Sequence, residues 1–147
     1  MAKTLRTEES IMIARPVADV FEYMSNPDNA PAWNGNVVDY NLESGKPDEV
    51  GSVTSFTAKV AGFKLEATEE LTDYQANKRL GFRSVKSKVG YDRELDFAVD
   101  GEHTRVTWVS EAEAGTGVFK FADPIVQKLH AHDVRSSLEK AKTILEA

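Results

Sequence analysis

The sequence predicts an α+β fold in which an antiparallel sheet of about seven strands packs against one long C-terminal helix. The middle of the chain alternates apolar and polar residues over short segments, as half-buried strands do. Turn-forming residues separate these segments by a few positions, so neighbouring strands run antiparallel. The chain ends in a long segment with helical spacing instead, which sets the helices apart from the sheet.

A strand and two short helices are expected in the first quarter of the chain. Residues 4–14 alternate weakly, with Ile11 and Ile13 on one face, and predict the first strand. Pro16 opens a helix, because the first N–H groups of a helix lack partners in any case. Its buried stripe has helical spacing and consists of Val17, Val20, Phe21 and Met24. Asn26-Pro27 ends that helix, and residues 28–34, with Trp33, predict a second short one.

Six further strands follow, joined by turns at residues 44–48, 61–62, 75–78 and 100–101. Each strand has one apolar face by alternation. These faces are Val38, Tyr40 and Leu42; Phe56, Ala58 and Val60; Phe63, Leu65, Ala67 and Leu71; Leu80 and Phe82; Tyr91, Leu95, Phe97 and Val99; and Val106 and Trp108. The alternation is cleanest over residues 91–99, where Asp92, Glu94 and Asp96 occupy the other face.

The long helix is expected to run from Pro124 to about Glu146, with Asp123 as its N-cap. At about 100° per residue, Val126, Val134, Ala141 and Ile144 share one broad face. His130 lies near the centre of that face, and Asp133 and Ser137 lie at its borders. An unpaired buried polar group costs about 1–3 kcal/mol, so these three residues require partners. They are expected either to face the interior and bind a ligand or its waters, or to lie near a wet opening or bond the sheet.

Composition narrows the function classes. The chain has 147 residues, which suits a single domain over 1–147, and a net charge of -6, which disfavours nucleic acid partners and anionic membrane surfaces. Cysteine is absent, which excludes disulfides and thiolate chemistry. No apolar run approaches the roughly 18 residues of a membrane span, and the N-terminus turns polar too early for a signal peptide. We therefore expect a soluble cytoplasmic protein without membrane insertion.

Five segments resemble, in order, motifs of the helix-grip superfamily. They are Ile11 to Phe21, which is similar to I-x-A-x-P-x-x-V-F; Asn26 to Trp33, which matches N-P-x-x-x-P-x-W; Val50-Gly51; Thr104 to Trp108, which matches T-R-V-T-W; and Leu138 to Lys142, in which Ala141 replaces the usual leucine. The superfamily, also called SRPBCC or START-like, includes the birch-pollen allergen and the polyketide cyclase/dehydrase proteins.

The resemblance implies a curved sheet wrapped around the C-terminal helix, with an elongated cavity between them. It also implies hydrophobic ligands such as lipids or polyketides. No cofactor is expected. Some members only bind and carry such molecules, and others cyclise or dehydrate them. The first hypothesis is therefore binding or transport of a small hydrophobic molecule. A cyclase/dehydratase-type enzyme without metal and a protein-interaction module are the alternatives, and a homodimer is left open.

Two charged residues interrupt the apolar strand faces. Arg93 shares a face with Tyr91 and Leu95, where a charge must be paired or reach water. It is either an anchor for a carboxylate or carbonyl ligand, or a strand-end arginine that reaches solvent or pairs with Glu69. Glu69 shares a face with Leu65, Ala67 and Leu71, so an internal Glu–Arg pair is a candidate for acid–base work or ligand orientation.

The remaining candidates are aromatic. Eight aromatic side chains are expected to line the pocket or the core: Trp33, Tyr40, Phe56, Phe63, Phe82, Tyr91, Phe97 and Trp108. Trp33 and Phe63 are the stronger ligand candidates, because one lies on the short helices and the other at a hairpin. A metal site is not expected from His130 and His132, which point about 200° apart on a helix. Ser137 lies too far along the helix from His130 for a catalytic triad.

Overall fold

The computed structural model describes residues 4–60, 63–87, 89–113 and 124–147. Its elements are β1 (Thr4–Ile13), α1 (Val17–Ser25), the 3-10 turn η1 (Pro27–Asn29), α2 (Ala30–Trp33), β2 (Val37–Ser44), β3 (Val53–Val60), β4 (Phe63–Gln75), β5 (Arg79–Lys86), β6 (Tyr91–Asp100), β7 (His103–Glu113) and α3 (Pro124–Glu146). The predicted order of strand, short helices, six strands and long helix is confirmed. The predicted turn at 61–62 and the N-cap at Asp123 lie outside the described residues.

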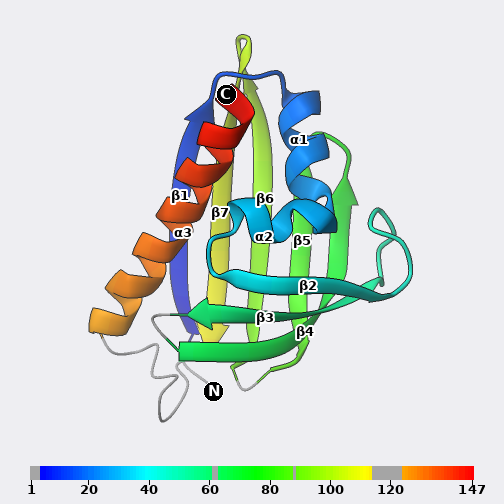
Figure 1. Cartoon of the computed structure of the whole chain (residues 1–147), viewed down its shortest axis with the longest axis vertical. Helices are drawn as coiled ribbons and strands as arrows, with labels where there is room; N and C mark the ends of the chain where they lie inside the picture. The colour runs from blue at the N-terminus through cyan, green and yellow to red at the C-terminus, as the bar shows by residue number, and fades with distance from the viewer. Residues whose placement is uncertain (1–3, 61–62, 88, 114–123) are drawn as a thin grey trace.

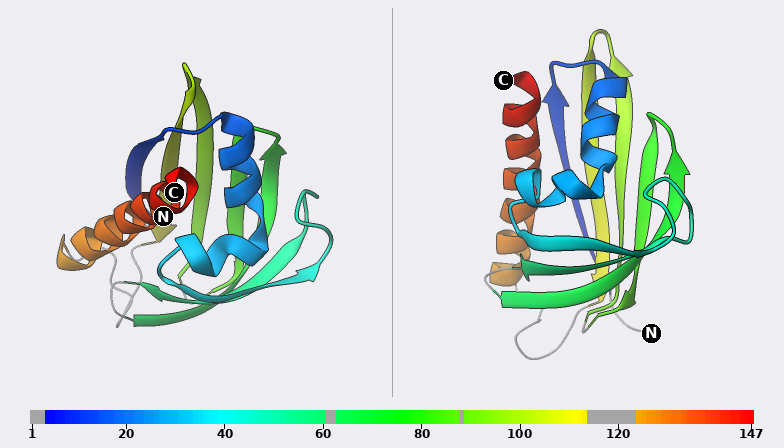
Figure 2. Two further views of the ribbon diagram at one scale, coloured as in Figure 1. Left: turned by 45° about the horizontal axis from the view of Figure 1, so that its top comes forward. Right: turned by 45° about the vertical axis from the view of Figure 1, so that its right-hand side comes forward.

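The seven strands form one antiparallel sheet in the order β1-β7-β6-β5-β4-β3-β2. Figure 1 shows β2, β3 and β4 crossing the lower end of the other strands, so the sheet is strongly bent. Both views of Figure 2 place α1, α2 and α3 on the concave side of this bend. This is the helix-grip architecture, and its concave side is where a buried site can form.

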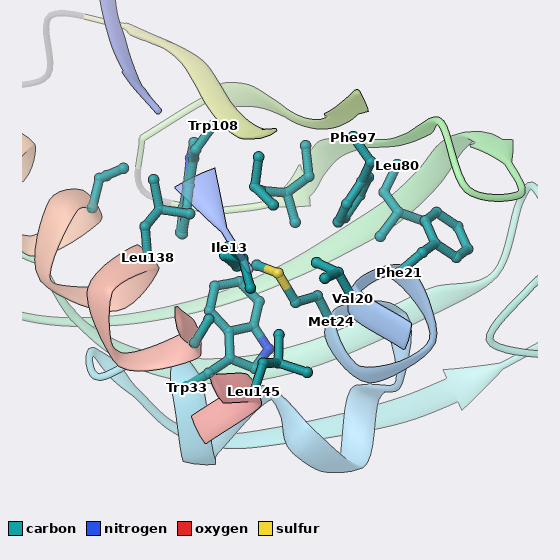
Figure 3. Packing of buried hydrophobic residues seen from close by; sticks show 14 of the residues in the cluster. Ile13, Val20, Phe21, Met24, Trp33, Leu80, Phe97, Trp108, Leu138 and Leu145 are labelled. Atoms are coloured by element: carbon teal, nitrogen blue, oxygen red, sulfur yellow. The ribbon is translucent and has the colours of Figure 1, made fainter. Parts of the chain in front are cut away.

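The main core fills the space between the helices and the strands β1 and β4 to β7 (Figure 3). The predicted α1 stripe is buried, since Val20, Phe21 and Met24 are at most 4% exposed and Val17 packs against the same cluster. Phe21 meets Phe97 edge to face, with ring centroids 5.1 Å apart. A smaller cluster of Leu65, Ala67 and Val89 lies at the other end of the sheet, where Val126 of α3 packs against it.

The C-terminal turn of α3 is fastened to the corner between β1 and α1. The Lys142 ammonium donates to the Met12 carbonyl, and the Arg15 guanidinium donates to the Leu145 carbonyl, each at 2.9 Å. The Ala14 amide donates to Glu146 Oε2 at 2.8 Å. The bond from Arg15 satisfies a carbonyl that a helix end leaves without a partner, and the three bonds together fix the upper end of α3 against the sheet.

Two predicted faces need correction in the strands. Val38 is 59% exposed, although Tyr40 points inward. A bulge between Val37 and Asp39 inserts one extra residue, so Val37 and not Val38 shares the inner face with Tyr40. Val99 is 68% exposed, because it lies beside the β6–β7 turn, which extends beyond the described helices (Figure 1). Alternation alone cannot report either a bulge or the end of a layer.

The buried face of α3 is also shifted from the prediction. It consists of Val134, Ser137, Leu138, Ala141 and Leu145, whereas Ile144 is 37% exposed. These positions follow the i, i+3, i+4, i+7 pattern from Val134. Leu145 therefore takes the place that the sequence analysis assigned to Ile144. In the described ranges, no helix is both long and apolar enough to cross a membrane.

Candidate functional site

A cavity of about 110 Å³ lies between the inner face of the sheet and α3. Its walls come from strands β2 to β4, β6 and β7, from α3, and from the turn before β2. They combine mainly apolar side chains with a few polar groups, the usual make-up of a small-molecule site. The lining residues are Asn34, Asn36, Val37, Tyr40, Phe56, Ala58, Leu65, Val89, Tyr91, Arg93, Trp108, Ser110, Ala112, His130 and Val134.

The polar end of this cavity is an ion pair between Arg93 of β6 and Glu69 of β4. Arg93 Nη2 lies 2.5 Å from Glu69 Oε1, and Nε lies 3.2 Å from Oε2. The hydroxyls of Tyr40 and Tyr91 donate to the same two oxygens, at 2.5 and 2.7 Å. Glu69 thus accepts four hydrogen bonds, which fills the capacity of a carboxylate. The structure therefore places Glu69 and Arg93 in contact, a pairing that the sequence alone left undecided.

The charges of this cluster are fixed at neutral pH. Burial would raise the pKa of Glu69, but the Arg93 charge and the donated hydrogen bonds lower it below its usual value. Burial and the nearby carboxylate raise the pKa of both Tyr40 and Tyr91, so both remain protonated donors. The pKa of Arg93 is raised by Glu69, against the effect of burial. Glu69 therefore orients its neighbours and holds no free lone pair for a substrate proton.

Arg93 lines the cavity and retains donor capacity. Its Nε and Nη2 are engaged by Glu69, and Nη2 also lies 3.4 Å from the Tyr40 hydroxyl. Its Nη1 makes no hydrogen bond to any described residue. The guanidinium stacks over the Phe82 ring, 4.0 Å from the centroid. A cation held on one edge and one face presents its remaining N–H groups in a fixed direction.

His130 of α3 lies on the opposite wall of the cavity. Its Nε2 is 3.4 Å from the Ser110 hydroxyl of β7, and Ser110 is the cross-strand neighbour of Arg93. Burial lowers the pKa of His130, partly offset by Asp133, so the imidazole is neutral at pH 7. Ser110 was missed by the sequence analysis, although its position two residues after Trp108 places it on the same strand face.

A second, smaller cavity of about 40 Å³ lies beneath α1 and α2. Trp33 lines it, and Trp33 meets Trp108 edge to face at 6.1 Å between centroids (Figure 3). The indole N–H groups of both tryptophans are buried, and neither has a hydrogen-bond partner among the described residues. Asn34, Tyr40 and Arg93 line both cavities.

The other predicted site residues lie elsewhere. Ser137 is 1% exposed, and its hydroxyl accepts from the Gly35 amide at 3.2 Å and donates to Asn34 Oδ1 at 3.4 Å, so it ties α3 to the turn after α2. Asp133 is partly buried on α3, where its charge acts on His130. Neither is among the described side chains that line the cavity. Phe63 begins β4, but its side chain lies outside the described part of the structure.

Other hollows are less suited to an apolar ligand. One of about 790 Å³ is an open groove whose walls include Lys64, Glu66 and Lys86, side chains that solvent reaches. Within the described ranges, no three histidine or acidic side chains are placed to hold a metal ion.

Solved structures share this fold at low sequence identity. The protein TTHA0849 from Thermus thermophilus is 19% identical with a TM-score of 0.83, and 97% of each chain is covered. A START superfamily protein from Mycobacterium smegmatis is 12% identical with a TM-score of 0.81, over 96% of this chain and 97% of the other. The Zhui aromatase/cyclase from Streptomyces sp. R1128 is 16% identical with a TM-score of 0.78, over 98% and 94%. At these identities the likeness establishes the fold alone.

No curated protein sequence is significantly similar to the chain. A family model does match, over residues 4–146, which is nearly the whole length. The sequence motifs of the chain and the bent sheet that surrounds α3 agree with that match. The chain therefore belongs to the family described as polyketide cyclase / dehydrase and lipid transport.

Proposed function

We propose that this protein binds a small, mostly apolar molecule carrying one neutral oxygen acceptor, such as a ketone. The observation that carries the proposal is the Arg93 guanidinium in the wall of an apolar cavity, anchored by Glu69 and with Nη1 unengaged by any described residue. The ligand oxygen would accept from Arg93, and its carbon chain would lie along Leu65, Val89 and Val134.

The charge balance favours a neutral acceptor over a carboxylate. Glu69 and Arg93 compensate each other, and the half-buried imidazole of His130 is neutral. A ligand carboxylate would add an uncompensated charge to a poorly hydrated site, which is costly. A carbonyl adds none and still receives a hydrogen bond from a charged donor, worth about 1.5–3 kcal/mol.

The cavity volume limits the ligand. About 110 Å³ is somewhat less than the roughly 150 Å³ of an apolar protein cavity that accepts benzene. The ligand body is therefore a short alkyl chain or a single ring. Long-chain lipids would require the walls to move apart.

The experiment is a binding comparison with methyl butyl ketone, hexanoate and hexane, read by tryptophan fluorescence. Both tryptophans of the chain contact the cavities, so the signal is local. The matched variant is Glu69→Gln/Arg93→Met, which removes both charges but leaves an amide oxygen for the tyrosine hydroxyls. We expect the wild type to bind the ketone more tightly than hexanoate.

In the double variant, affinity for the ketone relative to hexane should fall by about tenfold or more, because the charged donor is gone. Native mass spectrometry of the purified protein would add the mass of any retained ligand. If the wild type binds none of the three probes, or if the double variant leaves the ketone-to-hexane ratio unchanged, the proposal is wrong.

A second candidate function is an acid–base reaction on the bound carbonyl compound. The observation that favours it is a neutral imidazole, His130, in the wall of the cavity that also contains the Arg93 cation. Arg93 would polarise the carbonyl while His130 removes a proton from the adjacent carbon, which is the first step of many cyclisations and dehydrations.

This candidate has its own measurement. Proton abstraction would exchange the hydrogens next to the carbonyl of methyl butyl ketone for deuterium in heavy water, which NMR detects. The wild type should accelerate exchange and His130→Ala should not, while both still bind the ketone. Binding without accelerated exchange in the wild type would leave the protein a carrier.

A further inference from the structure

The two internal cavities approach each other at a shared wall. The cavity of about 110 Å³ lies on the α3 side, and the cavity of about 40 Å³ lies beneath α1 and α2. We call them the outer and the inner chamber. Three residues line both chambers: Asn34, Tyr40 and Arg93. The inner chamber is otherwise bounded by apolar side chains such as Met24, Leu71 and Leu95 and by the polar residues Ser25, Asn26, Ser52 and Thr54, so an alkyl chain that enters it would lie along the apolar part of its wall.

Tyr40 contributes a large side chain to this wall. It extends from β2 across the interior, where its hydroxyl donates to Glu69 of β4 at 2.5 Å and lies 3.4 Å from Arg93 Nη2 of β6. Its ring packs against Phe56, 5.7 Å between centroids. Arg93 is held by Glu69 on one edge and by Phe82 on one face. The phenol of Tyr40 therefore separates the chambers while the cation stays in place.

We propose that Tyr40 sets the length of the ligand by closing the inner chamber to it. In the wild type the chain of a bound ligand ends at the Tyr40 ring, and shortening this side chain joins the two chambers. The inference rests on the proposed function, because it concerns the extent of that same site. It adds a residue that determines specificity and a class of ligand, short alkyl carbonyl compounds, that the wild type selects.

The experiment measures Kd for straight-chain methyl ketones of increasing length, from butanone to undecanone, by tryptophan fluorescence. Each buried methylene tightens binding by about fourfold, so affinity rises with length until the chain meets an obstacle. We call the length at which affinity stops rising the break. The wild type should show the break at a short ketone. In Tyr40→Ala the break should move to longer ketones, and undecanone should bind about tenfold more tightly, or better, than to the wild type.

The matched control is Tyr40→Phe. This substitution keeps the ring between the chambers and loses only the hydroxyl, so the break should stay at the wild-type length.

Tyr40→Leu is the second variant, since it keeps apolar contact with Phe56 if the alanine variant fails to fold. Adding Ala30→Met, which fills the inner chamber from α2, should return the break of Tyr40→Leu to the wild-type position. An unchanged break in a folded Tyr40→Leu or Tyr40→Ala protein overturns the role of Tyr40, even when short ketones bind. Failure of every ketone to bind the wild type overturns the proposed function and this inference together.

Discussion

Arg93 of β6 donates two hydrogen bonds to the carboxylate of Glu69 on β4, and both side chains lie inside the bent sheet. The Glu69 side chain is 0% exposed and that of Arg93 is 14% exposed. A buried pair of this kind is weak evidence for net stability, because desolvation offsets the attraction. The pair instead fixes the orientation of the Arg93 cation at one end of an otherwise apolar cavity.

Breaking the pair from one side should destabilise the protein strongly. Glu69→Gln leaves the Arg93 charge buried without its partner, which costs about 3–5 kcal/mol of unfolding free energy. The adjacent Glu70→Gln breaks a surface pair with Arg83, worth about 0–1 kcal/mol. Urea denaturation at pH 7 measures both. Glu69→Gln/Arg93→Met should recover most of the loss. Equal losses of unfolding free energy in Glu69→Gln and Glu70→Gln would contradict a buried ion pair.

The buried face of α3 can be tested by truncation of two similar side chains. Leu138 is 1% exposed in the main core, and Leu138→Ala should cost about 2–5 kcal/mol of unfolding free energy. Ile144 is 37% exposed, and Ile144→Ala should cost about 1 kcal/mol or less. Thermal and urea unfolding compare them. A larger loss for Ile144→Ala would mean that the helix is rotated relative to the structure.

Glu94 on the outer face of β6 should make stability depend on pH. A hydrogen bond with Asp96, partial burial and the Asp96 charge raise the pKa of Glu94 from 4.5 to about 7, although Arg79 opposes the shift. Between these two pH values the folded protein holds a proton that the unfolded chain has released, so the contribution of Glu94 to stability falls as pH rises from about 4.5 to about 7.

Glu94→Gln should flatten this part of the pH profile and raise Tm at pH 8 relative to the wild type. Glu102→Gln, at the exposed β6–β7 turn, serves as the control and should leave the profile unchanged. Scanning calorimetry from pH 4 to pH 8 gives the comparison. A wild-type profile that rises over this range and is unaffected by Glu94→Gln would argue against a retained proton.

His130 should act in the opposite direction at acidic pH. Its pKa is lowered by burial from the ordinary 6.5, so below that value the unfolded chain binds a proton that the folded protein resists. The contribution of His130 to stability should therefore decline as pH falls below about 6.5, and affinity for methyl butyl ketone should decline with it. His130→Gln should weaken both trends, whereas His132→Gln, on the exposed face of α3, should preserve them. If the pH profiles of stability and affinity were the same for the two variants, the placement of His130 in the cavity wall would be wrong.

The sequence predicted the fold well because strands and helices leave periodic patterns and the connections are short. Even the α1 stripe of Val20, Phe21 and Met24 follows from spacing alone. The errors arose where local geometry departs from the period, as at the bulge beside Val38 and at the bare end of β6 near Val99. Neither departure leaves a signal in residue types.

The candidate site was predictable in part. Alternation placed Glu69 and Arg93 on inward faces, and two buried opposite charges need each other. Their meeting depends on β4, β5 and β6 being neighbours in register, which requires the sheet order. The role of Ser137 as a tie between α3 and the turn after α2 was not predictable, because its partners Asn34 and Gly35 lie about 100 positions earlier in the chain. The shared wall formed by Tyr40 was likewise not predictable, because it depends on how β2, β4 and β6 are placed relative to one another.

The role of Arg93 as the ligand's anchor can be measured through the carbonyl resonance of a bound ketone labelled with carbon-13 at that position. A hydrogen bond from the Arg93 guanidinium polarises the carbonyl and moves its resonance to higher frequency than in an apolar solvent. We expect this shift in the wild type and its loss in Glu69→Gln/Arg93→Met, with the ketone still bound. The same resonance position in both proteins would contradict the assignment of Arg93 as the ligand's anchor.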